Sequence, residues 1–133
     1  MLADSKNQDL YAEWIDYIED PKTKQAFRYI VGVAAASVEF VCYPQLKGAS
    51  GPVKDFRFFD SEGEQRFAFI TNKKWLLFYF RPPALRSQRY SRECLISDFS
   101  SFVETPAGEW TVKLSCVDDV VRLCKHIDPR QAD

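Results

Sequence analysis

The stretch of sequence with the clearest chemical character is a basic segment that contains an aromatic residue. Between positions 73 and 92 the chain carries six lysine or arginine side chains and no acidic one. Cations at this density can neutralise phosphates or carboxylates, and an exposed ring beside them can stack on an unpaired base. We expect the apolar run 75–80 inside this segment to lie in the core and the cations and the tyrosine to be exposed. The binding residues predicted from this pattern are Lys73, Lys74, Arg81, Arg86, Arg89, Tyr90 and Arg92.

A second candidate is the motif Gln45-Leu46-Lys47, which follows an expected strand and precedes a glycine-rich turn. This motif resembles the Gln-x-Lys variant of the catalytic strand in the PD-(D/E)xK nucleases. In that family the carboxylates, or the Gln, hold a divalent metal ion, and the Lys steadies the attacking water. The resemblance therefore implies a metal-dependent nuclease that uses Glu39, Gln45 and Lys47. The family also needs a metal-binding Asp on a neighbouring strand, whereas Glu39 falls on the same expected strand as Gln45.

The sequence offers few other groups for catalysis or metal binding. The carboxylates between 55 and 64 lack the regular spacing of a calcium-binding loop, so they are typical of a charged hairpin turn. His126 is the only histidine, which argues against hydrolases that depend on a Ser-His or Cys-His pair. The four cysteines form no Cys-x-x-Cys pair, and glycine motifs that bind phosphates are absent. We therefore expect reduced thiols, no cofactor and no metal ion.

The charged residues are distributed unevenly along the chain. The net charge is −1, but acids outnumber bases by five in residues 1–20 and by four in residues 93–133. Between residues 21 and 92 the bases outnumber the acids by eight. This segregation favours an anionic partner, although the acidic and basic regions could instead neutralise one another in the fold. The overall balance excludes a strongly basic protein of the histone-like kind.

Length and composition indicate a single globular domain. The chain has 133 residues, of which 46% are hydrophobic and 28% charged. No apolar run reaches the roughly 18 residues that a membrane span needs, and the N-terminal residues lack the apolar stretch of a signal peptide. We expect a soluble, cytoplasmic protein without membrane contact. The aromatic content of 15% would allow exposed tyrosines and a homodimer, the candidates for exposure being Tyr11, Tyr17, Tyr43 and Tyr90.

The spacing of apolar residues predicts an α+β fold with the order α-α-β-β-β-β-α-β-α. Asp20 and Pro21 are expected to start the second helix, and Pro44 to end the first strand. Residues 75–80 are apolar on both faces, which predicts a central strand covered on each side. We expect one domain over 1–133 with a mostly antiparallel sheet of about five strands, in which 1–36 could form a helical arm. The predicted helices are 7–19, 21–36, 91–103 and 115–128, and the predicted strands are 38–43, 56–59, 65–71, 75–80 and 109–114.

The sequence thus favours a small, non-enzymatic binding protein of the inhibitor or adaptor type. It would present its basic segment to an acidic protein surface or to nucleic acid. Binding would proceed by electrostatic steering followed by burial of a few arginine or aromatic anchors. The metal-dependent nuclease and a plain structural subunit remain as alternatives.

Overall fold

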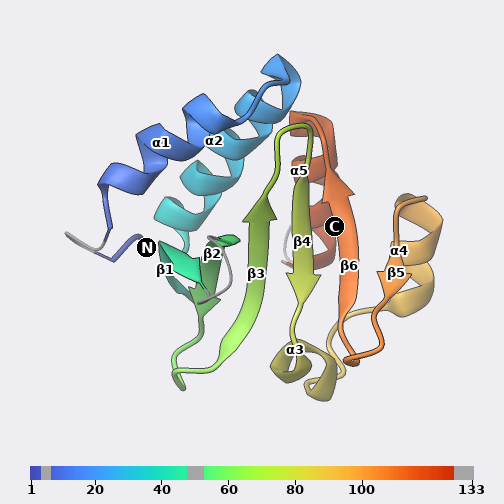
Figure 1. Cartoon of the computed structure of the whole chain (residues 1–133). Coiled ribbons are helices and arrows are strands. Elements are labelled where there is room, and N and C mark those ends of the chain that lie inside the picture. The colour runs from blue at the N-terminus through green and yellow to red at the C-terminus, as the bar shows by residue number, and fades with distance from the viewer. Residues whose placement is uncertain (4–6, 48–52, 128–133) are drawn as a thin grey trace.

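A computed structural model gives the fold of residues 1–3, 7–47 and 53–127, and the Lys47 side chain lies outside this description (Figure 1). Helices and strands occur in separate runs along the chain, as expected for the α+β class. The elements are α1 (Asp9–Tyr17), α2 (Pro21–Ala36), β1 (Val41–Lys47), β2 (Val53–Phe59), β3 (Gln65–Thr71), β4 (Leu76–Phe80), α3 (Pro82–Arg86), α4 (Arg92–Asp98), β5 (Val103–Glu104), β6 (Trp110–Leu114) and α5 (Val117–Ile127).

The strands form one antiparallel sheet in the order β1-β2-β3-β4-β6-β5. The predicted α+β class and antiparallel sheet are confirmed, but the sheet has six strands rather than about five. The additional strand, β5, is only two residues long and pairs with the start of β6. Its presence follows from a turn at 105–108, where Gly108 adopts a φ of 80° that a residue with a side chain rarely takes.

Three pairs of phenylalanines form the centre of the core. In β2, β3 and β4 the two phenylalanines of each pair stand two residues apart, so both point to the same face. The strand register aligns them into two rows across the sheet. Each of the six side chains is at most 7% exposed. The two rows are Phe56, Phe69 and Phe78, and Phe58, Phe67 and Phe80.

The helices α1, α2 and α5 pack against these phenylalanines. Trp14 of α1 meets Phe27 of α2 edge-on, and Phe27 in turn meets Phe69 of β3 at a ring-centroid distance of 6.0 Å. Val120 and Leu123 of α5 join the same core. The helical pair at the N-terminus therefore shares one core with the sheet. No helix within the described residues is long and apolar enough to cross a membrane.

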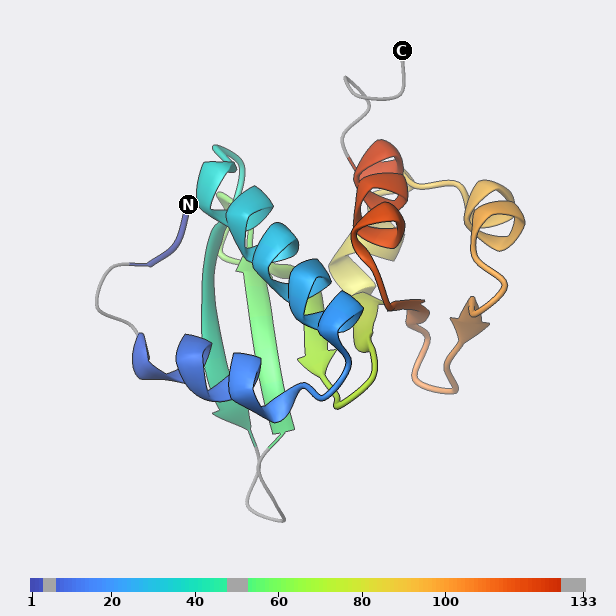
Figure 2. The same ribbon diagram turned by 90° about the horizontal axis from the view of Figure 1, so that it is seen from above.

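The opposite face of the sheet carries no helix in the described part of the chain (Figures 1 and 2). In β4, buried Leu76, Phe78 and Phe80 alternate with half-buried Leu77 and Tyr79. The prediction that a layer covers each side of this strand is therefore wrong. A strand with one packed face shows this alternation of buried and half-buried residues. The side chains on the other face of β4, Leu77 and Tyr79, are shielded only by their neighbours in the sheet.

The prediction that Pro44 ends the first strand is also wrong. β1 begins at Val41 and continues through Pro44 to Lys47, and Pro44 lies opposite Phe56. β1 is an edge strand of the sheet, and among the described residues only the bridge between Leu2 and Cys42 pairs its outer side. Proline, which has no N–H to donate, is tolerated in that position.

Two further boundaries differ from the prediction. The helix expected over 91–103 begins at its predicted cap, Ser91, but ends at Asp98, because residues 103–104 pair with β6 instead. Ile96 and Val103 are consequently exposed. Residues 82–86, read from the sequence as a stop after β4, form the short helix α3, whose first two positions accommodate Pro82 and Pro83.

Candidate binding surface

The structure separates the seven predicted binding residues into two groups at opposite ends of β4. Lys73 and Lys74 lie in the hairpin between β3 and β4. The other five lie beyond the far end of β4, from the N-cap of α3 onward (Figure 1). A strand of this length separates the groups by about 16 Å or more. They therefore make two surfaces rather than one continuous basic ridge.

The lysine end is held against the helices by its backbone. The carbonyl of Lys73 accepts hydrogen bonds from the backbone of Glu19 and Asp20 at 2.8 and 3.3 Å, and that of Lys74 accepts one from the Thr23 hydroxyl at 2.8 Å. The Lys73 ammonium lies 3.9 Å from the Glu19 carboxylate. Part of the basic segment thus neutralises part of the acidic N-terminal region.

Two arginines at the other end are paired with acids of the sheet edge. Arg81 donates to the largely buried carboxylate of Glu109, and Arg92 donates to Glu104. These acids lie 28 and 12 residues further along the chain. Both acids, Glu104 and Glu109, belong to the β5–β6 hairpin, which folds back beside the basic segment. Their charges cancel those of Arg81 and Arg92 locally.

Tyr90 is half-buried, which contradicts its expected exposure. Its ring meets Phe67 and Phe80 edge-on, with both centroid distances 5.5 Å. Its hydroxyl interacts with Arg66. Burial lowers the pKa of Arg66, but the contacts with Tyr90 and then with Asp60 together outweigh burial and raise this pKa above its ordinary value. A ring that packs against the core in this way is less available for stacking on a base than an exposed one.

Arg86 and Arg89 remain the accessible cations of this end. Arg86 has a side chain that is 64% exposed, and its only ion pair among the described residues is a 3.6 Å contact with half-exposed Glu64. Arg89 is exposed and has no ion pair in the part of the chain that the structure describes. Exposed pairs such as Arg86–Glu64 contribute about 0–1 kcal/mol, so a competing carboxylate can replace Glu64 at little cost. We call these two residues the arginine pair.

The uncovered sheet face was not recognised as a candidate surface in the sequence. The ring of Tyr43 stacks on Phe59 there, with centroids 5.4 Å apart. Arg57 donates to Asp55 at 2.8 Å, although Asp55 is only 5% exposed. Burial, and then Glu109, raises the pKa of the neighbouring Tyr79 above its ordinary value. The sequence does carry a signal for this face, because polar and aromatic residues occupy the positions that alternate with the core phenylalanines.

Glu39 and Gln45 of the nuclease hypothesis do not share one side of the sheet, and the side chain of Lys47 lies outside the described residues. Glu39 precedes β1 and lines a cleft on the helix-covered side. Gln45 alternates with buried Cys42 and Pro44, so it lies on the other face, directly opposite Asp55 of β2. Asp55 is engaged by Arg57. Among the described residues no three His, Cys, Asp or Glu side chains gather as metal ligands do.

The remaining polar candidates have structural partners. The carboxylate of Asp60 accepts from the backbone of Glu62 and Glu64, which closes the β2–β3 turn as a charged hairpin. His126, in the last turn of α5, lies 2.6 Å from the carboxylate of Asp98. None of the four cysteines takes part in a disulfide bond.

Comparisons with protein-family models, curated proteins and solved structures found no match to this chain. The function therefore has to be argued from the surfaces described above.

Proposed function

We propose that this chain is a non-enzymatic binding protein that recognises an acidic protein surface through the arginine pair, Arg86 and Arg89. The observation that carries the proposal is their exposure at the end of the sheet, where, among the described residues, the Arg86–Glu64 contact is the one ion pair that either arginine makes. Arginine is enriched at protein interfaces because its planar guanidinium forms paired hydrogen bonds with carboxylates. Electrostatic steering by these charges would raise the rate of association with the partner, and burial of the guanidinium groups would stabilise the complex.

Local charge favours a protein partner over nucleic acid. Binding to a phosphate backbone draws on many unpaired cations, since affinity grows with each phosphate neutralised. Around the arginine pair, however, Arg81 and Arg92 are neutralised by Glu109 and Glu104. Tyr90, the expected stacking residue, packs against the core. Two accessible arginines among mixed charges suit the separate carboxylates of a protein surface better than a continuous row of phosphates.

The test is fluorescence anisotropy with two labelled probes, an acidic peptide of alternating Glu and Tyr and a single-stranded oligothymidine of equal charge. We expect the peptide to bind more tightly than the oligonucleotide at 150 mM salt. The double variant Arg86→Glu, Arg89→Glu should weaken peptide binding by about tenfold or more, since two favourable contacts become repulsive.

The matched control is Lys22→Glu, Arg28→Glu on the exposed side of α2, which changes the net charge by the same amount. This control should bind the peptide like the unchanged protein. Equal loss in both double variants would mean that only net charge matters, and tighter binding of the oligonucleotide would favour nucleic acid. Either result would reject the proposal.

A further inference from the structure

Helix α1 presents a row of acids to solvent. Asp9, Glu13 and Asp16 are exposed and stand at positions i, i+4 and i+7, which share one face of a helix. None of the three forms an ion pair within the part of the chain that the structure describes. The helix itself contains no lysine or arginine. We call these three residues the acidic face.

The acidic face is electrostatically unfavourable in a single molecule. Like charges three or four positions apart on a helix repel one another. Asp16 also lies in the last turn of α1, where the helix carries a partial negative charge and no basic residue offsets it. A cation from another molecule would relieve both effects, so the acidic face favours a basic partner.

The arginine pair and the acidic face are complementary in charge, but they do not meet within one molecule. The chain leaves α1 beside the β3–β4 hairpin, where the backbone N–H of Glu19 donates to the carbonyl of Lys73 at 2.8 Å. The arginine pair lies beyond the other end of β4, and Figure 1 shows α1 and α3 in different parts of the molecule. The ion pair between Lys73 and Glu19 leaves both surfaces exposed.

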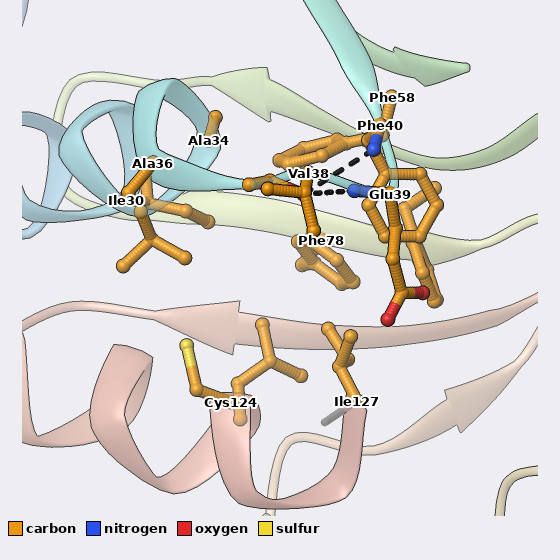
Figure 3. A pocket seen from close by; sticks show the side chains of 14 residues that line it. Ile30, Ala34, Ala36, Val38, Glu39, Phe40, Phe58, Phe78, Cys124 and Ile127 are labelled. Carbon is orange, nitrogen blue, oxygen red and sulfur yellow. Dashed lines mark hydrogen bonds between the residues drawn. The ribbon is translucent and has the colours of Figure 1, made fainter. Parts of the chain in front are cut away.

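The apolar cleft on the helix-covered side is a poorer match for the arginine pair. It lies between α2 and α5, has a volume of about 450 Å³ and has a floor formed by Phe58, Phe67 and Phe78. Glu39 is the only charged residue among the described residues that line it (Figure 3). The acidic face offers three carboxylates along about 10 Å of helix, so two arginines three positions apart can each reach one.

We propose that the acidic surface recognised by the arginine pair is the acidic face of a second copy of this chain. Arg86 and Arg89 of one molecule contact carboxylates of α1 in the other. This inference rests on the proposed function, because it names the partner of the same site. Exposed ion pairs are individually weak, so the contact between copies is transient and is weakened by salt.

Sedimentation equilibrium of the unchanged protein at concentrations up to about 1 mM measures this contact. The apparent mass should rise above 15.4 kDa with concentration at about 10 mM salt and return to that value at about 500 mM salt. The net charge of −1 keeps general repulsion between copies small. A protein that stays monomeric at about 1 mM and low salt would overturn the inference.

Two neutralising variants locate the contact. They are Arg86→Gln, Arg89→Gln and Glu13→Gln, Asp16→Asn. Each should raise the dissociation constant about fivefold, since about two exposed ion pairs are lost. Matched controls change the net charge equally at other exposed positions and should keep the original constant, so equal weakening by them would overturn the inference. The controls are Lys22→Gln, Arg28→Gln and Glu93→Gln, Asp118→Asn.

Charge reversal tests whether the two surfaces meet each other. The variants are Arg86→Glu, Arg89→Glu and Glu13→Lys, Asp16→Lys, and each alone should stay monomeric. Their mixture should associate, and the ¹⁵N–¹H spectrum of the labelled arginine variant should then show shifts at residues 9–17 and 84–90. Shifts spread over every acidic surface would indicate attraction by net charge alone and would overturn the inference.

Peptide binding separates this inference from the proposed function. If the protein stays monomeric but the arginine pair binds the acidic Glu-Tyr peptide, the inference is wrong and the proposed function stands. If neither a second copy nor the peptide binds, both are wrong.

Discussion

At the scale of single residues, burial decides the chemistry of Cys42. Its side chain is fully buried on the packed face of β1, beside the phenylalanine rows. Burial disfavours the thiolate and raises the pKa of this thiol from 9.0 to about 12. Cys94, by contrast, is exposed on α4. Ionisation of Cys42 should therefore be coupled to unfolding.

The free energy of unfolding should fall as the pH rises from about 9 toward 12. The Cys42 thiol ionises near 9 in the unfolded chain and near 12 in the folded one, so its contribution is complete below 9 and is lost as pH rises through that window. Urea unfolding at a series of pH values should give a shallower decline for Cys42→Ala than for the unchanged protein. Cys94→Ala should keep the original slope. An unchanged slope in Cys42→Ala would contradict this assignment, with Tyr11 and Tyr79 left as the sources of the decline.

Residue types could be read from the sequence, but their partners could not. The segment 73–92 was recognisable as basic because charge is a property of the residues themselves. Arg81 and Arg92 are neutralised by acids 28 and 12 positions away, which meet them only because β5 and β6 fold back beside α3. No local rule in the sequence places the Tyr90 ring against Phe67 and Phe80, so the sequence alone predicts an exposed ring.

At the scale of elements, α2 is the best specified by the sequence. Asp20 at the N-cap accepts from the backbone N–H of Lys22, and Pro21 follows at the first helical position, as predicted. β3 also has its predicted bounds. β1 and β5 were mispredicted because their limits depend on pairing with distant strands, which overrides the local signals of Pro44 and of the apolar spacing in 95–103.

A buried hydroxyl joins α2 to the β3–β4 hairpin and to the segment between β6 and α5. Thr23 of α2 is fully buried, and its hydroxyl donates to the carbonyl of Lys74 at 2.8 Å, with Asp20 and Ser115 also in reach. Thr23→Val should lower the free energy of unfolding by about 1–3 kcal/mol, because the carbonyl loses its buried donor.

The matched control is Thr71→Val in β3. The Thr71 hydroxyl is also buried, but it has no hydrogen-bond partner among the described residues. Removing it should be neutral or stabilising, since no hydrogen bond is lost. Chemical denaturation of both variants measures the difference, and equal destabilisation would show that the Thr23 hydrogen bonds contribute nothing specific.

At the scale of the whole molecule, the sheet separates two unlike surfaces. The helices enclose the phenylalanine core and the apolar cleft on one side. The other side is an uncovered face of polar and aromatic residues, and the arginine pair lies at the end of the sheet beyond β4. The one-sided packing could not be read from residues 75–80, because an apolar side chain on an uncovered face looks the same in sequence as one in a second core.

The central claim is that an acidic protein surface binds at the arginine pair. The most direct measurement is an ¹⁵N–¹H correlation spectrum of the labelled protein during titration with the acidic Glu-Tyr peptide. We predict saturable shifts for the backbone amides of residues 84–90, with little change along the exposed side of α2. Shifts confined to other surfaces, or a uniform small drift across all exposed amides, would contradict the account.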